Sequence, residues 1–177
     1  MKKICVVITA RPSYSRVRSV LMELNNNPKI DLQIILCCSA IIEKFGDVSE
    51  QVKNDNLNIF EKLYTLSQGE EIISVPKTTG ITIIELSNSF SKLKPDAVVT
   101  IADRYETIAT SIAASYQNIP LIHLQGGEIT GNIDEKVRHA NTKLSDLHLV
   151  SNESAKEVLL RMGEIEKSIF VTGCPSI

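Results

Sequence analysis

The segment after the first apolar run of the sequence carries side chains suited to binding a phosphate. Arg11 and Arg16 flank two hydroxyl residues, Ser13 and Ser15, where a helix is expected to begin. The first N–H groups of a helix lack intrahelical partners and attract anions. We therefore predict that this segment, with Arg11, Arg16 and its two hydroxyls, forms a cradle for an anion.

Two later segments carry carboxylates. Asp103 and Arg104 stand together after an apolar run, and Glu128 and Asp134 accompany the glycine pair 126–127, which lets the backbone approach a ligand closely. Three carboxylates beside arginines suit proton transfer next to a phosphate group. Taken singly, these features also have structural explanations. Asp103 and Arg104 would form a surface ion pair, and the glycines a plain turn.

The histidines give a weaker signal. His123 closes a predicted strand and His139 lies early on the following helix, so each either reaches the pocket or fills a structural position. His148 lies within an apolar run and is predicted to be structural. Arg138 and Lys143 share the helix of His139 and are expected on a solvated face or at the rim of the site. No two histidines have the H-x-x-x-H spacing of a helical zinc site.

The cysteines predict neither a metal site nor a disulfide scaffold. Cys5, Cys37, Cys38 and Cys174 form no C-x-x-C pair, and three of them lie in apolar runs. Neighbours on a strand, such as Cys37 and Cys38, point to opposite faces and cannot hold one metal together. Reduced, structural thiols are expected.

Motifs for common cofactors are missing from the sequence. Residues 9–12 read T-A-R-P where a dinucleotide-binding protein has G-x-G-x-x-G, and no G-x-x-x-x-G-K-[ST] or G-x-S-x-G occurs. This argues against NAD or FAD, a P-loop nucleotidase and an α/β-hydrolase. We predict no cofactor and no metal.

Short apolar runs alternate with segments of helical periodicity, which predicts alternating strands and helices. The expected strands are 4–8, 32–37, 57–64, 97–101, 120–124, 147–150 and 169–172. Helices are expected from about Ser13 to the N-N-N-P run at 25–28 and over 81–93, 106–114, 134–144 and 154–162, with a short or broken helix over 43–53 and a long loop over 67–80.

This alternation is typical of an α/β fold with a doubly wound, Rossmann-like parallel sheet. No linker divides residues 1–177, so one domain is expected. Such sheets bind ligands beyond the carboxyl ends of their strands, where the candidate residues lie.

Composition excludes several classes of protein. The 177 residues are 43% hydrophobic and 23% charged, as in globular domains. A formal charge of −2 offers no basic surface to nucleic acid. No apolar run reaches the roughly 20 residues of a membrane helix. The run after Lys3 is too short for a signal peptide, so a cytoplasmic protein is expected.

Three blocks of the sequence resemble the hydrolysing UDP-N-acetylglucosamine 2-epimerases, which make N-acetylmannosamine and UDP for sialic acid synthesis. The blocks are D-R-Y-E at 103–106, H-L-Q-G-G-E at 123–128 and I-D-E-K-V-R-H-A-N-T-K-L at 133–144. The ending G-C-P-S at 173–176 is similar to the interdomain junction of that family. The resemblance extends in order over the whole chain.

The resemblance implies a fold and a partner. Family members consist of two Rossmann-like halves of the glycosyltransferase-B type, with the active site between them. This chain resembles the N-terminal half. The C-terminal half, which supplies most uridine-diphosphate contacts and a further catalytic histidine, is expected to lie outside residues 1–177. By the same resemblance the protein is expected to form a homo-oligomer, and this half is expected to be inactive alone.

The resemblance also implies roles for individual residues. Asp103, Glu128 and Asp134 match the catalytic carboxylates of the family, while Arg11, Ser15 and Arg104 match positions that contact the phosphates of UDP-N-acetylglucosamine (UDP-GlcNAc). The implied reaction expels UDP from C1 as the C2 proton leaves. Water then adds at C1 and a proton returns to the opposite face of C2. Which carboxylate serves each step stays open.

One departure leaves alternatives open. The sialic-acid branch usually reads R-A-D-Y after the first strand, whereas residues 11–14 read R-P-S-Y. This is closer to the enzymes that reversibly interconvert UDP-GlcNAc and its manno epimer (UDP-ManNAc). Relatives that act on UDP- or GDP-linked diacetamido sugars are a second alternative. A nucleotide-sugar-binding module without turnover is a third.

Overall fold

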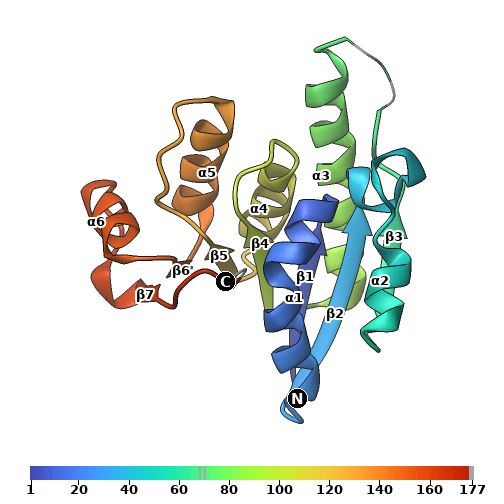
Figure 1. Ribbon diagram of the computed structural model, residues 1–177, viewed down its shortest axis with the longest axis horizontal. Coiled ribbons are helices and arrows are strands. Elements are labelled where there is room, and N and C mark those ends of the chain that lie inside the picture. The colour runs from blue at the N-terminus through green and yellow to red at the C-terminus, as the bar shows by residue number, and fades with distance from the viewer. Residues whose placement is uncertain (68, 70, 176–177) are drawn as a thin grey trace.

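Seven parallel strands form one sheet in the order β3-β2-β1-β4-β5-β6-β7 (Figure 1). The computed structural model describes residues 1–67, 69 and 71–175. The strands are β1 Lys2–Ile8, β2 Ile30–Cys37, β3 Ile59–Leu63, β4 Ala97–Ile101, β5 Leu121–Leu124, β6 Leu147–Val150 and β7 Ile169–Val171. This order reverses direction between β1 and β4, as in Rossmann folds, and confirms the predicted doubly wound α/β class.

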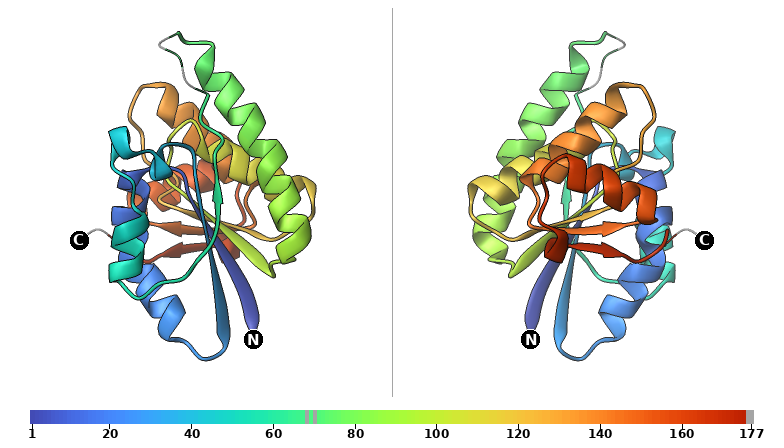
Figure 2. Two further views of the ribbon diagram at one scale, coloured as in Figure 1. Left: turned by 90° about the vertical axis from the view of Figure 1, so that its right-hand side faces the viewer. Right: turned by 90° about the vertical axis from the view of Figure 1, so that its left-hand side faces the viewer.

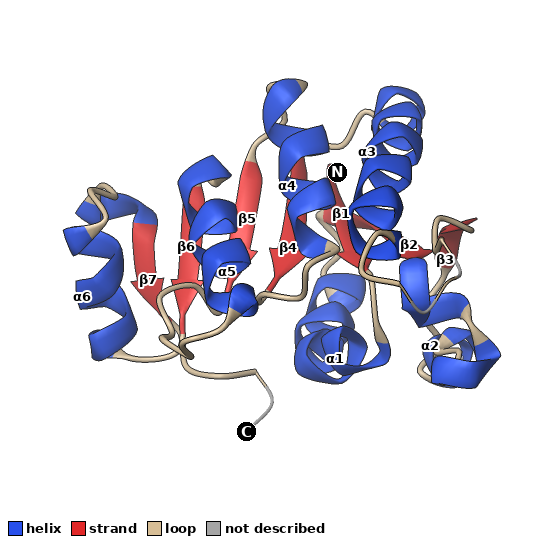
Figure 3. Cartoon of the chain, turned by 90° about the horizontal axis from the view of Figure 1, so that it is seen from above, coloured by secondary structure: helices blue, strands red, loops and turns tan. Residues whose placement is uncertain are grey.

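Helices cover both faces of the sheet. They are α1 Arg11–Asn26, α2 Ser49–Asn54, α3 Ser74–Leu93, α4 Thr107–Tyr116, α5 Ile133–Leu144 and α6 Glu153–Arg161, with short 3₁₀ helices η1 Cys38–Ile41, η2 Glu43–Phe45 and η3 Glu166–Ser168. Seen from above, α1 and α2 lie on one face, and α3 and α4 on the other (Figure 3). Helix α5 packs against α4 and β5, and α6 against β6 and β7.

The core explains why the strands appear as continuous apolar runs. All five residues of β4 are buried. On β1, Val6 and Ile8 belong to the cluster beneath α1 and α2, whereas Cys5 and Val7 belong to the cluster beneath α3 and α4. Because successive side chains alternate between two buried faces, a central parallel strand needs apolar residues at every position.

Two helices begin earlier than predicted. Helix α3 begins at Ser74, so the predicted loop over 67–80 is wrong for its second half. Pro76 fits there because proline is tolerated in the first turn of a helix, whose N–H groups have no intrahelical partners. Helix α1 begins at Arg11 and has no side-chain cap, instead of starting near Ser13. Residues 68 and 70 of the predicted loop lie outside the described residues.

The neighbouring cysteines do not point to opposite faces as predicted. Cys38 leaves the strand in a left-handed conformation with φ +52°. Its Sγ lies 3.9 Å from Sγ of Cys37, and both thiols are free and buried. Burial and the neighbouring Cys38 raise the pKa of Cys37 well above its usual range.

The end of the chain returns to the first helix. After β7, Gln125 Nε2 lies 3.1 Å from Sγ of Cys174, and Ser19 on α1 donates a hydrogen bond of 3.0 Å to the Pro175 carbonyl. The two side views show the C-terminal end beside the first helices (Figure 2). Among the described residues, no helix combines the length and apolar character needed to span a bilayer.

Candidate functional site

The candidate site lies at the carboxyl edge of the sheet, around the reversal between β1 and β4. Strand β1 leads into α1, β4 into the turn 102–106 and β5 into the segment 125–132. Strand β4 pairs with both β1 and β5. The arginine-bearing segment and the carboxylate segments predicted from the sequence therefore start side by side.

Arg138 joins the two carboxylate segments. Its guanidinium donates hydrogen bonds to the carboxylate of Asp103 and to the main-chain carbonyl of Glu128. Arg16 Nη1 lies 3.6 Å from the other carboxylate oxygen of Asp103. Only 2% of Arg138 is exposed, which excludes the solvated face for this residue and leaves the alternative that it lies at the rim of the site. Lys143, predicted on the same face, is exposed and pairs with Glu164.

Two buried side chains hold the turn that carries Asp103. Ala102 has φ +59°, a left-handed conformation that costs a non-glycine residue about 1–2 kcal/mol. Its carbonyl lies 3.0 Å from His123 Nε2 and 3.4 Å from Asn141 Nδ2. Because a carbonyl only accepts, the proton of His123 is assigned to Nε2. Nδ1 then accepts from the Thr142 hydroxyl at 3.1 Å.

The three histidines do not face the cavities at the carboxyl edge of the sheet. His123 is fully buried, and burial lowers its pKa to about 4, so the ring is neutral at pH 7. The structure thus favours the structural alternative for His123. His139 lies 3.7 Å from the Glu135 carboxylate and lines no cavity described below. His148 is buried in β6, 3.3 Å from the Glu164 carboxylate, as expected of a structural residue.

Glu128 and Asp134 lie on either side of the 129–132 turn. The Glu128 carboxylate accepts a hydrogen bond of 3.1 Å from the Ser151 hydroxyl. Asp134 lies in the first turn of α5, whose N-cap Asn132 accepts from the Asp134 N–H at 3.0 Å. A carboxylate is favoured at this end of a helix because the N-terminal N–H groups carry partial positive charge.

Arg104 pairs with Glu106 and not with Asp103. Its Nη2 and Nε donate to the fully buried Glu106 carboxylate at 3.1 and 3.2 Å. Burial disfavours the charged form of Arg104, but the negative charges of Glu106 and Asp134 raise its pKa above the usual value. The surface ion pair considered for Asp103 and Arg104 does not form.

Arg11 and Arg104 both line a cavity of about 430 Å³ at this edge, a volume within the usual range for small-ligand sites. A glycine gives Arg11 its space. Gly46 has φ +83°, and a Cβ there would lie only 2.9 Å from Arg11 Cδ. The cavity therefore presents two guanidinium groups to a ligand, from α1 and from the turn after β4.

Ser15 does not line this cavity. It lines a separate hollow together with Tyr14, Arg18 and Asp55. There Arg18 and Tyr14 both bind the Asp55 carboxylate, which ties α1 to the end of α2. The structure brings Arg11 and Arg104 together but leaves Ser15 outside their cavity.

The glycine pair packs closely against protein, and Gly127 also lines a cavity of about 270 Å³ together with Glu128. A Cβ at Gly126 would lie 3.0 Å from both His123 Nδ1 and Thr142 Oγ1. Gly127 has φ +83°, and a Cβ there would lie 2.4 Å from the Ala155 carbonyl. The glycines therefore allow α5 and α6 to approach the end of β5.

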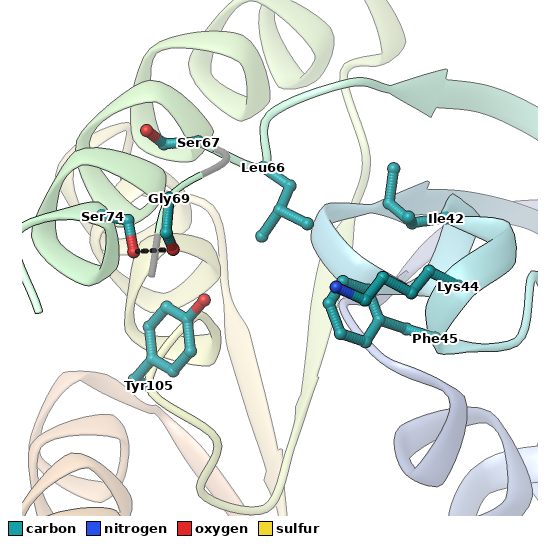
Figure 4. A pocket seen from close by; sticks show the side chains of 8 residues that line it. All are labelled: Ile42, Lys44, Phe45, Leu66, Ser67, Gly69, Ser74 and Tyr105. Atoms are coloured by element: carbon teal, nitrogen blue, oxygen red, sulfur yellow. Dashed lines mark hydrogen bonds between the residues drawn. The ribbon is translucent and has the colours of Figure 1, made fainter. Parts of the chain in front are cut away.

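The sequence pattern does not reveal the apolar part of the edge. Phe45, Leu66 and Tyr105 line the cavity of the two arginines and also a neighbouring cavity of about 410 Å³ (Figure 4). Phe45 ends the short 3₁₀ helix η2 and Leu66 lies in a loop, and such short segments show no periodicity that would mark a buried or binding face. Only Tyr105 carried a signal, because it directly follows Arg104 in the D-R-Y-E block.

Within the described ranges, no group of three or more histidine, cysteine, aspartate or glutamate side chains has an arrangement that would hold a metal ion. The charged groups that the structure brings to this edge are carboxylates and guanidinium groups. Arg138 binds the Asp103 carboxylate and the Glu128 main-chain carbonyl, and the negative charge of Asp134 contributes to the raised pKa of Arg104.

Comparisons with known proteins identify the family. A family model described as UDP-N-acetylglucosamine 2-epimerase matches residues 22–177. A UDP-N,N′-diacetylbacillosamine 2-epimerase (hydrolyzing) of Legionella pneumophila is 36% identical over 177 residues, which is 100% of this chain and 47% of that protein. The UDP-N-acetylglucosamine 2-epimerase of Neisseria meningitidis serogroup B is 30% identical and also matches 100% of this chain, but only 46% of its own length.

Solved structures show the same fold. A crystal structure of the UDP-GlcNAc 2-epimerase of Methanocaldococcus jannaschii, in complex with UDP-GlcNAc and UDP, superposes with a TM-score of 0.83 at 25% identity, covering 97% of this chain and 46% of that one. MurG of Acinetobacter baumannii, at 12% identity and a TM-score of 0.59, is similar in fold alone.

The chain spans about half the length of the curated relatives it matches. The family model matches far more than half of residues 1–177. The resemblance drawn from the sequence blocks is thereby confirmed, as is the glycosyltransferase-B-like architecture of the fold. The chain belongs to the UDP-N-acetylglucosamine 2-epimerase family.

Proposed function

We propose that the natural protein containing residues 1–177 is a hydrolysing nucleotide-sugar 2-epimerase. It converts UDP-GlcNAc to UDP and N-acetylmannosamine. The observation that carries this proposal is the contact of Arg138 with both Asp103 and Glu128. That contact joins the Asp103 carboxylate to the segment that carries Glu128, at the edge of the sheet where Arg11 and Arg104 line a cavity.

The proposed reaction has two stages. First the C2 proton is transferred to a carboxylate while the C1–O bond breaks. Its electron pair leaves on UDP, and a 2-acetamidoglucal remains. Water then adds its hydroxyl at C1, and a proton returns to C2 on the opposite face. Asp103, Glu128 and Asp134 are the candidate proton carriers, because carboxylates positioned within reach of a substrate serve both as acid and as base.

The arginines have a different role in the proposal. Arg11 and Arg104 line one cavity from two elements, and guanidinium groups match the geometry of phosphate oxygens. They would bind the diphosphate and stabilise the charge that develops on it as UDP leaves. Arg16, 3.6 Å from Asp103, would lie between the arginines that bind the diphosphate and the carboxylates that transfer protons. Ser15 and His139 stay candidate site residues in this proposal, and they would reach the substrate only after the protein moves on binding it.

A second substrate is favoured by the relatives. Two proteins at 36% identity, from Legionella pneumophila and Campylobacter jejuni, are named as hydrolyzing 2-epimerases of N,N′-diacetylbacillosamine bound to UDP, or to GDP or UDP. Relatives named UDP-N-acetylglucosamine 2-epimerase are 30% identical or less. A diacetamido sugar is therefore the alternative substrate of the same proposed reaction.

The proposed activity requires a second domain, because this chain matches only about half of each relative. We propose that the two domains enclose the nucleotide sugar and that the protein assembles as a homo-oligomer.

Product analysis tests the proposal. The natural protein is incubated separately with UDP-GlcNAc and with UDP-N,N′-diacetylbacillosamine, and the products are identified by NMR and mass spectrometry. Free UDP with a free manno-configured sugar from either substrate supports hydrolytic epimerisation. UDP-ManNAc without free sugar would assign the protein to the reversible epimerases. Binding of both substrates without turnover would favour the binding-module alternative.

A further inference from the structure

The cavity of about 410 Å³ beside the two arginines has a largely apolar wall. Phe45, Leu66 and Ile42 face Tyr105 across it, and Lys44 lies at its side (Figure 4). The Lys44 ammonium lies over the Phe45 ring, 5.8 Å from its centre. Among the described residues that line the cavity, none is a carboxylate.

This cavity adjoins the cavity of the two arginines. Phe45, Leu66 and Tyr105 line both. A nucleotide sugar whose diphosphate lies against Arg11 and Arg104 would therefore extend its sugar ring toward these three side chains. C1 of the ring carries the diphosphate, so the opposite side of the ring, with C4 and C6, would enter the apolar cavity.

The wall is anchored by the fold. Leu66 follows Thr65, whose buried hydroxyl accepts from the Cys38 N–H at 3.3 Å and lies 2.8 Å from the Thr82 hydroxyl of α3. Phe45 ends η2, where the Gly46 N–H donates to the Glu43 carbonyl at 2.9 Å. These contacts fix both residues on the carboxyl edge, so they form a preformed surface for a ligand.

The chemistry of the wall distinguishes the two substrates. In UDP-GlcNAc, C4 carries a hydroxyl group and C6 is a hydroxymethyl carbon, and both groups lose hydration in an apolar cavity. In UDP-N,N′-diacetylbacillosamine, C4 carries an acetamido group and C6 is a methyl carbon, and both groups bury apolar surface there. A methyl group in a fitting apolar pocket is worth about 10- to 200-fold in kcat/KM.

We propose that Phe45, Leu66 and Tyr105 form a specificity subsite that receives the C4 acetamido and C6 methyl groups of a UDP-linked diacetamido sugar. The inference rests on the proposed function and names the substrate class of the same site. UDP-N,N′-diacetylbacillosamine is then the preferred substrate over UDP-GlcNAc.

The test compares the two sugars in the natural protein and in matched variants. Steady-state kinetics give the ratio of kcat/KM for UDP-N,N′-diacetylbacillosamine to that for UDP-GlcNAc. Phe45→Ala removes the aromatic ring at a side chain that is already 51% exposed, so the fold is retained. Phe60→Ala on β3 removes the same ring at a site 56% exposed that lines neither cavity. Phe45→Leu keeps an apolar wall.

The proposed subsite predicts that kcat/KM for UDP-N,N′-diacetylbacillosamine is at least about 10 times that for UDP-GlcNAc in the unmodified protein. Phe45→Ala lowers the ratio about tenfold, Phe45→Leu restores most of it, and Phe60→Ala leaves it unchanged. A ratio below 1, or equal ratios for Phe45→Ala and Phe60→Ala, overturns the subsite while leaving the epimerase proposal intact. If neither sugar is turned over, the epimerase proposal fails. The ratio of the two dissociation constants from calorimetry, in the same variants, then decides the subsite.

Discussion

Arg138 of α5 and Asp103 after β4 form an ion pair that is largely hidden from solvent, with 3% and 14% of their side chains exposed. The same guanidinium holds the Glu128 main-chain carbonyl. Arginine can do this because its planar group carries five donors in a fixed fork, whereas lysine offers a point charge. We infer that Arg138 sets the distance between the two candidate acid–base segments.

Replacing Arg138 tests this positioning. Arg138→Lys keeps a positive charge but cannot hold both segments, and a displacement of about 1 Å in an active site costs on the order of 100-fold in rate. We therefore expect kcat to fall about 100-fold, with a smaller change in KM. An unchanged kcat in Arg138→Lys would show that the contact with both segments is not needed for catalysis.

The same pair contributes to stability. Removing one partner of a buried ion pair costs about 3–5 kcal/mol, because the other charge stays buried without compensation. Arg138→Met is therefore expected to lower the free energy of unfolding by about this amount, discounted for the partial exposure of Asp103, in urea denaturation. Arg161→Met, which breaks the exposed pair with Glu157, is the matched control and should cost less than about 1 kcal/mol.

The polarity of the buried face of α5 explains why a solvated face was one of the two expectations for Arg138. The buried residues of this helix are Arg138, Asn141 and Thr142. Sequence periodicity locates a buried face by its apolar residues, so a helix that turns polar residues inward appears solvated on that side. Arg138 is held inside by Asp103, Asn141 by the 102–107 turn, and Thr142 by His123.

The apolar strands, in contrast, were predictable. The run at 97–101 is buried at every position, and its bounds match β4. The doubly wound α/β class followed from the alternation of strands and helices. The cavity walls were not predictable, because Phe45 and Leu66 come from a short 3₁₀ helix and a loop that only the tertiary fold brings together. Likewise, the glycines at 126–127 were expected to let the backbone approach a ligand, and only the fold shows that they also let α5 and α6 pack against the end of β5.

Stability should depend on pH through His123. Burial lowers its pKa from 6.5 to about 4 in the folded protein. Below pH 6.5 the unfolded chain binds a proton that the folded chain does not, so stability is full above this pH and is lost as the pH falls toward 4. The loss approaches about 3 kcal/mol. His123→Gln should flatten this decline in urea midpoints measured from pH 7 to pH 4, and an equally steep decline in the variant would contradict the assignment.

Alanine substitutions at two glycines with similar φ angles would distinguish the cost of backbone strain from the cost of a steric clash. Gly127 and Gly131 have φ of +83° and +75°, but only at Gly127 would a Cβ meet protein, 2.4 Å from the Ala155 carbonyl. Gly131→Ala should cost about 1–2 kcal/mol from the left-handed conformation alone. Gly127→Ala should cost clearly more, since α6 must also move. Equal losses of unfolding free energy would show that α6 shifts freely.

Residues 1–177 alone should bind UDP-GlcNAc weakly. If a second domain supplies part of the contacts, the isolated chain still pays the full entropic cost of association for fewer interactions. Calorimetric titration should detect no low-micromolar binding. Tight binding by this chain alone would contradict the proposal that two domains enclose the substrate.

Isotope labelling tests the central claim most directly. The natural protein is incubated with its nucleotide sugar in D₂O enriched in ¹⁸O. Elimination breaks the C1–O bond and exchanges the C2 proton, so the account predicts a free manno-configured sugar with deuterium at C2 and UDP without ¹⁸O. Protium at C2, or ¹⁸O in the β-phosphate of UDP, would contradict epimerisation through a glucal on this edge of the sheet.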